Sequence, residues 1–279
     1  MRIIRTAILL AISLLAGAPA QAQHCRLALA LALDVSSSVD ALEYDLQRVG
    51  LAGALNAPDV RHAILSGAQG NVTLSVYEWS GFNQQKLQLD WMLLASNDDI
   101  DEAVRVLATM ERSHDDFPTA VGQALGYGAI LLERAPDCTR KVLDFSGDGT
   151  NNYGFGPASA YAHFPFDDVT VNGLAILTQN VDVLHYYQSQ IVRGPNAFVI
   201  AASGFEDFQT AMTRKLYREI NDIMLGRLEH LAPAPRFRPK GVKPAGCRAA
   251  GICGPWRARI ARLSSGPGQH RQARKALHQ

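Results

Sequence analysis

The 279-residue sequence lacks the short motifs that identify several common classes of enzyme. It has no G-x-S-x-G nucleophile elbow, no G-x-x-x-x-G-K-S/T phosphate loop, no H-E-x-x-H zinc motif and no G-x-G-x-x-G after an expected strand. It also offers no identifiable general base beside the candidate site described below. These absences disfavour an enzyme and make a binding function the leading expectation.

The sequence also lacks an apolar run of membrane length, which needs about 20 residues. The apolar run at residues 6–16 is much shorter and follows a basic start at residues 1–5. Because Ala18, Ala20 and Ala22 supply A-x-A cleavage sites, residues 1–22 are predicted to be a secretory signal peptide rather than an uncleaved anchor. No lipidation pattern precedes Cys25. A periplasmic or secreted protein is therefore expected.

Cysteine is scarce, with four residues in the chain, and export would permit them to form disulfides. Cys25 lies just ahead of the first expected strand, and Cys138 lies just ahead of the expected strand at residues 141–145. If these strands are parallel neighbours, both thiols lie at the same end of the sheet and can bridge; the alternative is two unpaired core residues. The pairing of Cys247 and Cys253 stays open.

Acidic residues are absent from residues 233–279, which hold 11 Lys and Arg. Residues 23–232 hold 14 Lys and Arg against 26 Asp and Glu, so the body is acidic and the tail is basic. The Pro/Gly/Arg-rich tail has no helical or strand period and is predicted to be disordered. A solvated extension is expected, with contacts to anionic lipid, nucleic acid or the acidic body as alternatives. The folded body is not expected to bind nucleic acid.

Strands and helices alternate along residues 23–232, which predicts an α/β fold with helices covering a mostly parallel sheet. Helix 39–55 has Asp40 available as its cap. Its expected apolar face is Leu42, Leu46, Val49 and Ala52 or Gly53. The hairpin 72–79 and 86–92 supplies two strands. Further strands are expected at 27–33, 141–145, 169–177 and 197–201, and further helices at 97–110, 119–133, 181–191 and 205–228.

The segment Asp34-Val35-Ser36-Ser37-Ser38 carries most of the functional signal, because it directly follows the apolar strand 27–33. A carboxylate and two hydroxyls at alternate positions of such a loop form an oxygen nest that suits a hard divalent cation. Loops from several strands converge at the carboxyl edge of a parallel sheet. Two other loops could complete the site, one with Thr119 at the start of a helix and one with Asp148 between glycines at the end of a strand.

This set of residues resembles the metal-ion-dependent adhesion site (MIDAS) of von Willebrand factor A-type domains. Asp34, Ser36 and Ser38 match its D-x-S-x-S motif, Thr119 its threonine and Asp148 its Asp-Gly turn, in the family's order and spacing. The resemblance covers about residues 25–225. Short stretches such as Glu78-Trp79-Ser80-Gly81 look more narrowly like a bacterial exported branch whose role is not established.

The resemblance implies a Rossmann-like, three-layer fold over residues 23–232, with a central, mostly parallel sheet, one antiparallel edge strand and helices on both faces. It implies that Asp34, Ser36, Ser38, Thr119 and Asp148 bind Mg²⁺ or Mn²⁺, some of them through water. A partner protein's Asp or Glu would complete the metal's coordination shell. The first strand would neighbour the one that ends at Asp148, which also supports a Cys25–Cys138 bridge.

Two features near the site need separate interpretation. The loop before the family's threonine is often Gly-rich, whereas this chain has Asp116-Phe117-Pro118, in which proline stiffens the approach to Thr119. Asp144 lies inside an apolar strand, four residues before Asp148. It either orients the site from behind the ligands or pairs with a helix group as a structural carboxylate, and we favour the structural role.

Two other functions remain as alternatives to a protein-binding module. A metal-dependent hydrolase or phosphatase is one, because Asp34 at a strand end invites comparison with aspartyl-phosphate chemistry. That chemistry normally has a second acid two residues on, where this chain has Ser36. The other alternative is an assembly factor or chaperone for an exported complex, to which the basic tail would add a second contact.

Overall fold

A computed structural model describes residues 24–66, 70–178 and 182–231 of the chain. The predicted signal peptide, the predicted tail at residues 233–279, Cys247 and Cys253 lie outside these residues. No helix in the described part of the chain is long and apolar enough to cross a membrane.

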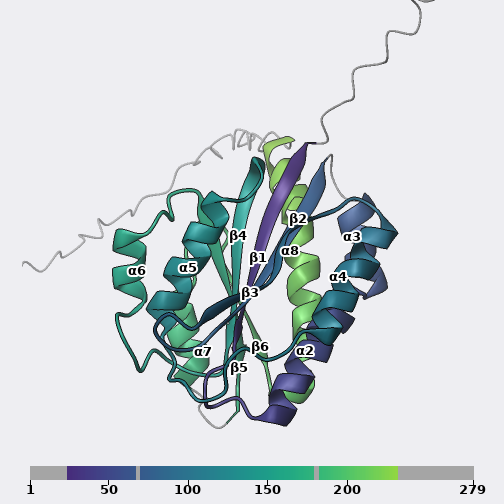
Figure 1. Ribbon diagram of the computed structural model, residues 1–279. Coiled ribbons are helices and arrows are strands. Elements are labelled where there is room, and N and C mark those ends of the chain that lie inside the picture. The colour runs from purple at the N-terminus through teal and green to yellow at the C-terminus, as the bar shows by residue number, and fades with distance from the viewer. Residues whose placement is uncertain (1–23, 67–69, 179–181, 232–279) are drawn as a thin grey trace, which may run out of the picture. The chain divides into compact units, whose positions relative to one another are not determined.

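One six-stranded sheet forms the centre of the fold, with the order β3-β2-β1-β4-β5-β6 (Figure 1). All neighbouring strands are parallel except β3, which runs antiparallel to β2 at one edge. This arrangement confirms the predicted α/β fold and its antiparallel edge hairpin. The strands are β1 (Cys25–Asp34), β2 (Asn71–Trp79), β3 (Gln85–Leu94), β4 (Cys138–Gly147), β5 (Val169–Ile176) and β6 (Val199–Ala202).

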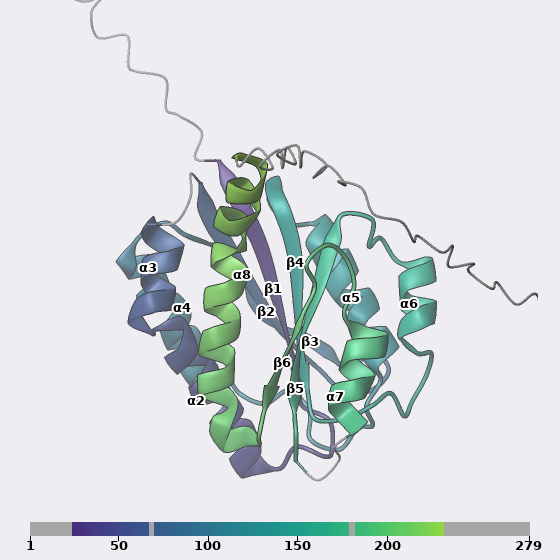
Figure 2. The same cartoon turned by 180° about the vertical axis from the view of Figure 1, so that it is seen from behind.

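Helices cover both faces of the sheet, as Figures 1 and 2 show from opposite sides. One face carries α2 (Ala41–Leu55), α3 (Pro58–Ser66), α4 (Asn97–Thr109), the 3₁₀ turn η3 (Phe205–Asp207) and α8 (Phe208–Leu231). The other face carries α5 (Val121–Glu133), α6 (Pro157–His163), α7 (Asp182–Tyr186) and the π-helical turn η2 (Tyr187–Ile191).

Strand β1 shows why the chain builds two cores. Every residue of β1 is buried, and side chains alternate between the two faces of a strand. Its leucines, from Leu27 to Leu33, pack into the core under α2, α3, α4 and α8. Its alanines, from Ala28 to Ala32, pack into the core under α5, α6 and α7.

The disulfide predicted between Cys25 and Cys138 is present, with the two Cα atoms 4.5 Å apart. The two cysteines face each other across the parallel ladder of β1 and β4. The bridge therefore joins the central strands at their amino ends, opposite the edge that carries the candidate site.

The expected apolar face of the first helix is wrong at Leu42 and Val49, although Ala52 is buried as expected. In α2, Leu42 and Val49 are exposed and Leu46 is only partly buried, whereas Tyr44 and Gln47 are buried. The Tyr44 hydroxyl donates to a Glu78 carboxylate oxygen, and the Gln47 amide nitrogen donates to the Asp34 carbonyl. These hydrogen bonds offset part of the cost of burying the two polar side chains, and apolar periodicity cannot detect such burial. The expected Asp40 cap is correct and forms a capping box with Glu43.

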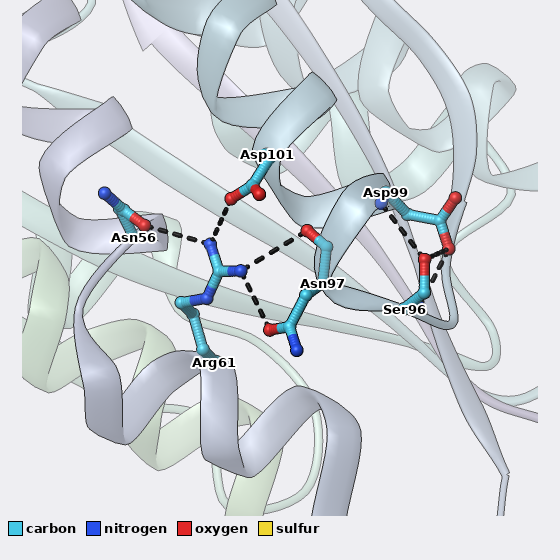
Figure 3. A network of polar contacts seen from close by, with 6 residues as sticks. All are labelled: Asn56, Arg61, Ser96, Asn97, Asp99 and Asp101. Atoms are coloured by element: carbon cyan, nitrogen blue, oxygen red, sulfur yellow. Dashed lines mark hydrogen bonds and ion pairs between the residues drawn. The ribbon is translucent and has the colours of Figure 1, made fainter.

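The sequence interpretation missed the short helices α3 and α6. Helix α3 has only nine residues, and its position depends on tertiary contacts. Figure 3 shows that Arg61 of α3 donates to Asn56 at 3.0 Å, to Asp101 at 2.6 Å and to the Asn97 side chain at 2.8 Å. Arg61 thus joins the end of α2 to the start of α4, a link between distant residues that no local pattern encodes.

Asp144 has the structural role that the sequence favoured. Its carboxylate lies 2.8 Å from the Lys215 ammonium of α8, which also contacts Glu219 at 2.6 Å. All three side chains are fully buried. The amide of Asn172 donates to the same Glu219 oxygen. This cluster fastens α8 to the middle of β4 and β5.

Candidate metal centre

The five predicted ligands converge at the carboxyl edge of the sheet. Asp34 ends β1 and is followed by Ser36 and Ser38, while Asp148 directly follows β4. Thr119, where the helix was predicted to start, lies two residues before α5, which begins at Val121. Chain connections leave β1 and β4 toward opposite faces, so the site occupies the topological switch point where open α/β sheets bind ligands.

Their polar atoms form one connected cluster. Ser38 Oγ donates to Asp148 Oδ1 at 2.8 Å and lies 3.2 Å from Ser36 Oγ. Thr119 Oγ1 donates to Ser36 Oγ at 3.3 Å, and the backbone N–H of Ser36 donates to Asp34 Oδ1 at 2.8 Å. The structure thus brings together all five residues from three segments of the chain.

The cluster fits a divalent cation by its chemistry. Asp34 Oδ2 is buried and makes no hydrogen bond, which is costly for a carboxylate oxygen. Burial, together with the negative charge of Asp148, raises the pKa of Asp34 to about 7, and burial also raises the pKa of Asp148. A divalent cation would offset the repulsion of the two carboxylates. Two carboxylates and three hydroxyls form an all-oxygen set, which Mg²⁺ and Mn²⁺ prefer.

Hydroxyl ligands are essential to this interpretation. Within residues 24–66, 70–178 and 182–231, no group of three or more His, Cys, Asp and Glu side chains is placed to hold a metal. A zinc site of the His/Cys type is therefore not found in this part of the chain, and Ser36, Ser38 and Thr119 must complete any ligand set.

Residues 24–224 match a protein family described as "protein of unknown function (DUF1194)". The chain belongs to this family. No curated protein matches it.

Several solved structures have a fold similar to that of this DUF1194 chain. Proximal thread matrix protein 1 (PTMP1) from the mussel byssus, with a zinc-occupied MIDAS motif, has a TM-score of 0.52 and 17% identity over 71% of this chain and 49% of that chain. The PilB minor pilin from Streptococcus sanguinis has a TM-score of 0.52 and 13% identity over 74% of this chain and 64% of that chain. A von Willebrand factor type A protein from Catenulispora acidiphila has a TM-score of 0.49 and 15% identity over 71% and 43% of the two chains.

These likenesses bear on the fold alone. The DUF1194 chain has the von Willebrand factor A-type fold that its sequence predicted. It spans about half the length of PTMP1 and about two thirds of the pilin, so those proteins carry regions that have no counterpart in the match.

Arg112 holds the D-x-S-x-S loop of the DUF1194 chain through backbone contacts, a role that sequence reasoning missed. Its guanidinium donates to the carbonyls of Val35, Ser36 and Val39 at 3.1, 3.2 and 2.7 Å. From α2, Gln47 donates to the Asp34 carbonyl at 3.0 Å. Five N–H donors in a fixed fork suit arginine to collecting several carbonyls. Because these are contacts to backbone groups, no spacing of residue types signals them.

Asn152 holds the Thr119 segment in the same way. Its side chain accepts from the Thr119 N–H at 2.8 Å, and its own N–H donates to the Thr119 carbonyl at 3.0 Å. The N–H of Ser37 donates to the Phe117 carbonyl at 2.9 Å. Each of the three loops is therefore bonded to another one, which fixes the spacing of the five predicted ligands.

Gly147 permits a close approach behind Asp34. A Cβ at this position would lie 2.7 Å from Asp34 Oδ2 and 2.7 Å from the hydroxyl of Tyr187 in η2. That hydroxyl is buried and, like Asp34 Oδ2, makes no hydrogen bond. The Tyr187 hydroxyl and Asp34 Oδ2 therefore both lie close to Gly147, which leaves no room there for a side chain.

Gly147→Ala is expected to lower the free energy of unfolding by about 1–3 kcal/mol and to weaken metal binding, because overpacking would displace Asp34. Urea unfolding and a metal titration of the same protein measure the two effects. Gly156→Ala is the matched control, since a Cβ there meets no atom within 4 Å. Equal behaviour of the two variants would contradict the close packing around Asp34.

Proposed function

We propose that this chain is a metal-dependent protein-binding module. Asp34, Ser36, Ser38, Thr119 and Asp148 would hold a divalent cation, Mg²⁺ or Mn²⁺, some of them through water. The bound ion would supply a positive centre for a carboxylate, and an Asp or Glu of a partner protein would complete its coordination shell. The observation that carries this proposal is the unpartnered, buried Asp34 Oδ2 within a cluster of five oxygen-bearing side chains.

Other observations agree with this proposal. PTMP1 has a zinc-occupied MIDAS motif on a similar fold, which supports a divalent metal at the corresponding edge of this sheet. The Cys25–Cys138 disulfide fits an exported protein, since such bonds persist in oxidising compartments. Catalysis is not proposed, because no residue at the site is identified as a general base.

Titration with Mg²⁺, Mn²⁺ and Zn²⁺ tests the metal part of the proposal. A ligand that binds only the folded state stabilises it by about 2.7 kcal/mol at 100 times its Kd, or about 5–10 °C in Tm for a domain of this size. Asp34→Asn is expected to abolish this shift, because it replaces a charged ligand. Asp168→Asn, which alters an exposed carboxylate, is expected to keep it. A shift of equal size in both variants would refute the site.

The partner part of the proposal needs a capture experiment. Immobilised wild-type protein and Asp34→Asn protein are exposed to the same extract, with Mn²⁺ or with chelator. We expect a partner that elutes with chelator and is absent from the Asp34→Asn surface. A partner retained equally by both surfaces, or retained in chelator, would show that the metal does not link the two proteins.

A further inference from the structure

Three exposed aromatic side chains lie on loops at the edge of the sheet that carries the proposed metal site. They are Phe82, Phe117 and Tyr153, with exposed fractions of 49, 37 and 52%. In the described part of the chain, the only other large aromatic side chain this exposed is Tyr217, on α8. Exposed aromatic groups that gather at one place on a surface mark interaction sites more often than scattered ones do.

Each aromatic side chain belongs to a loop that is bonded to the ligand loops. The Phe117 carbonyl accepts from Ser37, within the D-x-S-x-S segment. Phe82 follows Gly81, where an added Cβ would lie 3.2 Å from Phe117 Cβ, so the two loops touch. Tyr153 follows Asn152, which is bonded to Thr119. We call these three residues the aromatic cluster.

The same edge of the sheet is acidic. Residues 35–40, 80–84, 113–120 and 148–156 form its loops and contain no Lys or Arg. They do contain the exposed Asp40, Asp115 and Asp116, in addition to Asp148. The nearby Arg112 donates to loop carbonyls. Away from the metal, this surface would therefore repel further negative charge on a partner.

We propose that the aromatic cluster and the acidic loops select the partner. This partner is a protein segment with one Asp or Glu that reaches the metal, apolar residues on both sides of that acid, and Lys or Arg outside the apolar residues. This inference rests on the proposed function and adds the chemistry that surrounds the carboxylate. Aromatic side chains at the centre of an interface supply much of its binding energy. Basic residues complement Asp40, Asp115 and Asp116 and can stack on the exposed rings.

Synthetic peptides displayed on streptavidin test this proposal against the immobilised full chain, with multivalency making weak binding measurable. The first peptide is Lys-Leu-Leu-Asp-Leu-Leu-Lys. The second replaces each leucine by serine, the third replaces both lysines by glutamate, and the fourth replaces the aspartate by asparagine. In Mn²⁺ we expect the first peptide to bind at least about tenfold more tightly than each of the others, which corresponds to one interface residue of about 1.4 kcal/mol.

Variants of the protein locate the effect. Phe82→Ser and Phe117→Ser are each expected to weaken binding of the first peptide by about tenfold while the Mn²⁺-induced shift in Tm stays unchanged. Tyr217→Ser is the matched control, because it removes an equally exposed aromatic group from α8, and it is expected to bind like wild type.

The outcomes separate this inference from the proposed function. Equal, Mn²⁺-dependent binding of the leucine and serine peptides would overturn the proposed role of the aromatic cluster in selecting the partner. The metal-dependent capture of a carboxylate would still stand. Wild-type binding by both phenylalanine variants would do the same. If no aspartate peptide binds in a Mn²⁺-dependent manner, both proposals are overturned.

Discussion

Lys215→Met is expected to lower the free energy of unfolding by about 3–5 kcal/mol at pH 8, because it removes one partner of a buried ionic cluster. Lys215, Asp144 and Glu219 are fully buried, and Lys215 contacts both carboxylates. Methionine keeps most of the side-chain volume, so the lost stability reflects uncompensated charge rather than a cavity. Urea unfolding measures the free energy of unfolding, and Lys86→Met, at an exposed position of β3, is the control.

The pH dependence of this effect has a definite sign. Burial and then the charge of Glu219 raise the pKa of Asp144 to about 8, against about 4 in an unfolded chain. The folded protein thus binds the proton of the Asp144 carboxyl more tightly than the unfolded chain does. The stability gained from this protonation is complete below about pH 4 and is lost as the pH rises toward 8. Lys215 lowers the pKa of Asp144, because its charge stabilises the ionised carboxylate. The free energy of unfolding lost in Lys215→Met is therefore expected to be smaller at pH 5, where Asp144 is protonated, than at pH 8.

A variant of the carboxylate itself checks this account. Asp144→Asn is expected to reduce the dependence of stability on pH between about 4 and 8, because one of the titrating groups is gone while Asp34, with a pKa raised to about 7, remains. The other groups that face it, Lys215, Glu219 and Asn172, remain in place. If Lys215→Met costs the same stability at pH 5 and pH 8, the cluster does not control folding through charge.

Cys25→Ser combined with Cys138→Ser is expected to cost about 2–5 kcal/mol of stability, because the bridge closes a long loop in the unfolded chain. The two cysteines are 113 residues apart in the sequence. The chain-entropy model assigns large stabilisation to loops of that length, although native-state effects reduce it in practice.

Two measurements distinguish the bridge from a packing effect of the serines. Wild-type protein unfolded in reducing agent is expected to show the same stability as the double variant, while the double variant is expected to be insensitive to reducing agent. A double variant as stable as the oxidised wild-type protein would show that the bridge does not contribute to folding stability.

The sequence predicted the parts of the fold that rest on strong local patterns. The alternating leucines and alanines before Asp34 predicted a buried central strand, and Asp40 predicted the start of α2. The chemistry of the D-x-S-x-S segment predicted a metal loop, which stays a prediction. Thr119 and Asp148 were expected beside it because loops meet at the carboxyl edge of a parallel sheet, and the family resemblance supported the same set.

Other features depended on contacts between distant residues. The buried face of α2 contains Tyr44 and Gln47, which donate hydrogen bonds to Glu78 of β2 and to the Asp34 carbonyl of β1 only once those strands are in place. Arg112 and Asn152 act through backbone groups, which have no signature in residue type. The position of the Tyr187 hydroxyl close to Gly147 requires both that glycine and a π-helical turn. Periodicity describes one element at a time and cannot find such contacts.

The disulfide also governs the alignment of the two carboxylates at the far end of the sheet. Cys25 stands opposite Cys138, and the same uninterrupted ladder places Leu33 opposite Ser146. A slip of one residue would displace β1 by about 3.3 Å and turn each of its side chains to the other face. The covalent bond prevents that slip. By fixing the register of β1 against β4 at the amino end of the sheet, the disulfide also fixes the relative positions of Asp34 and Asp148 at the carboxyl end.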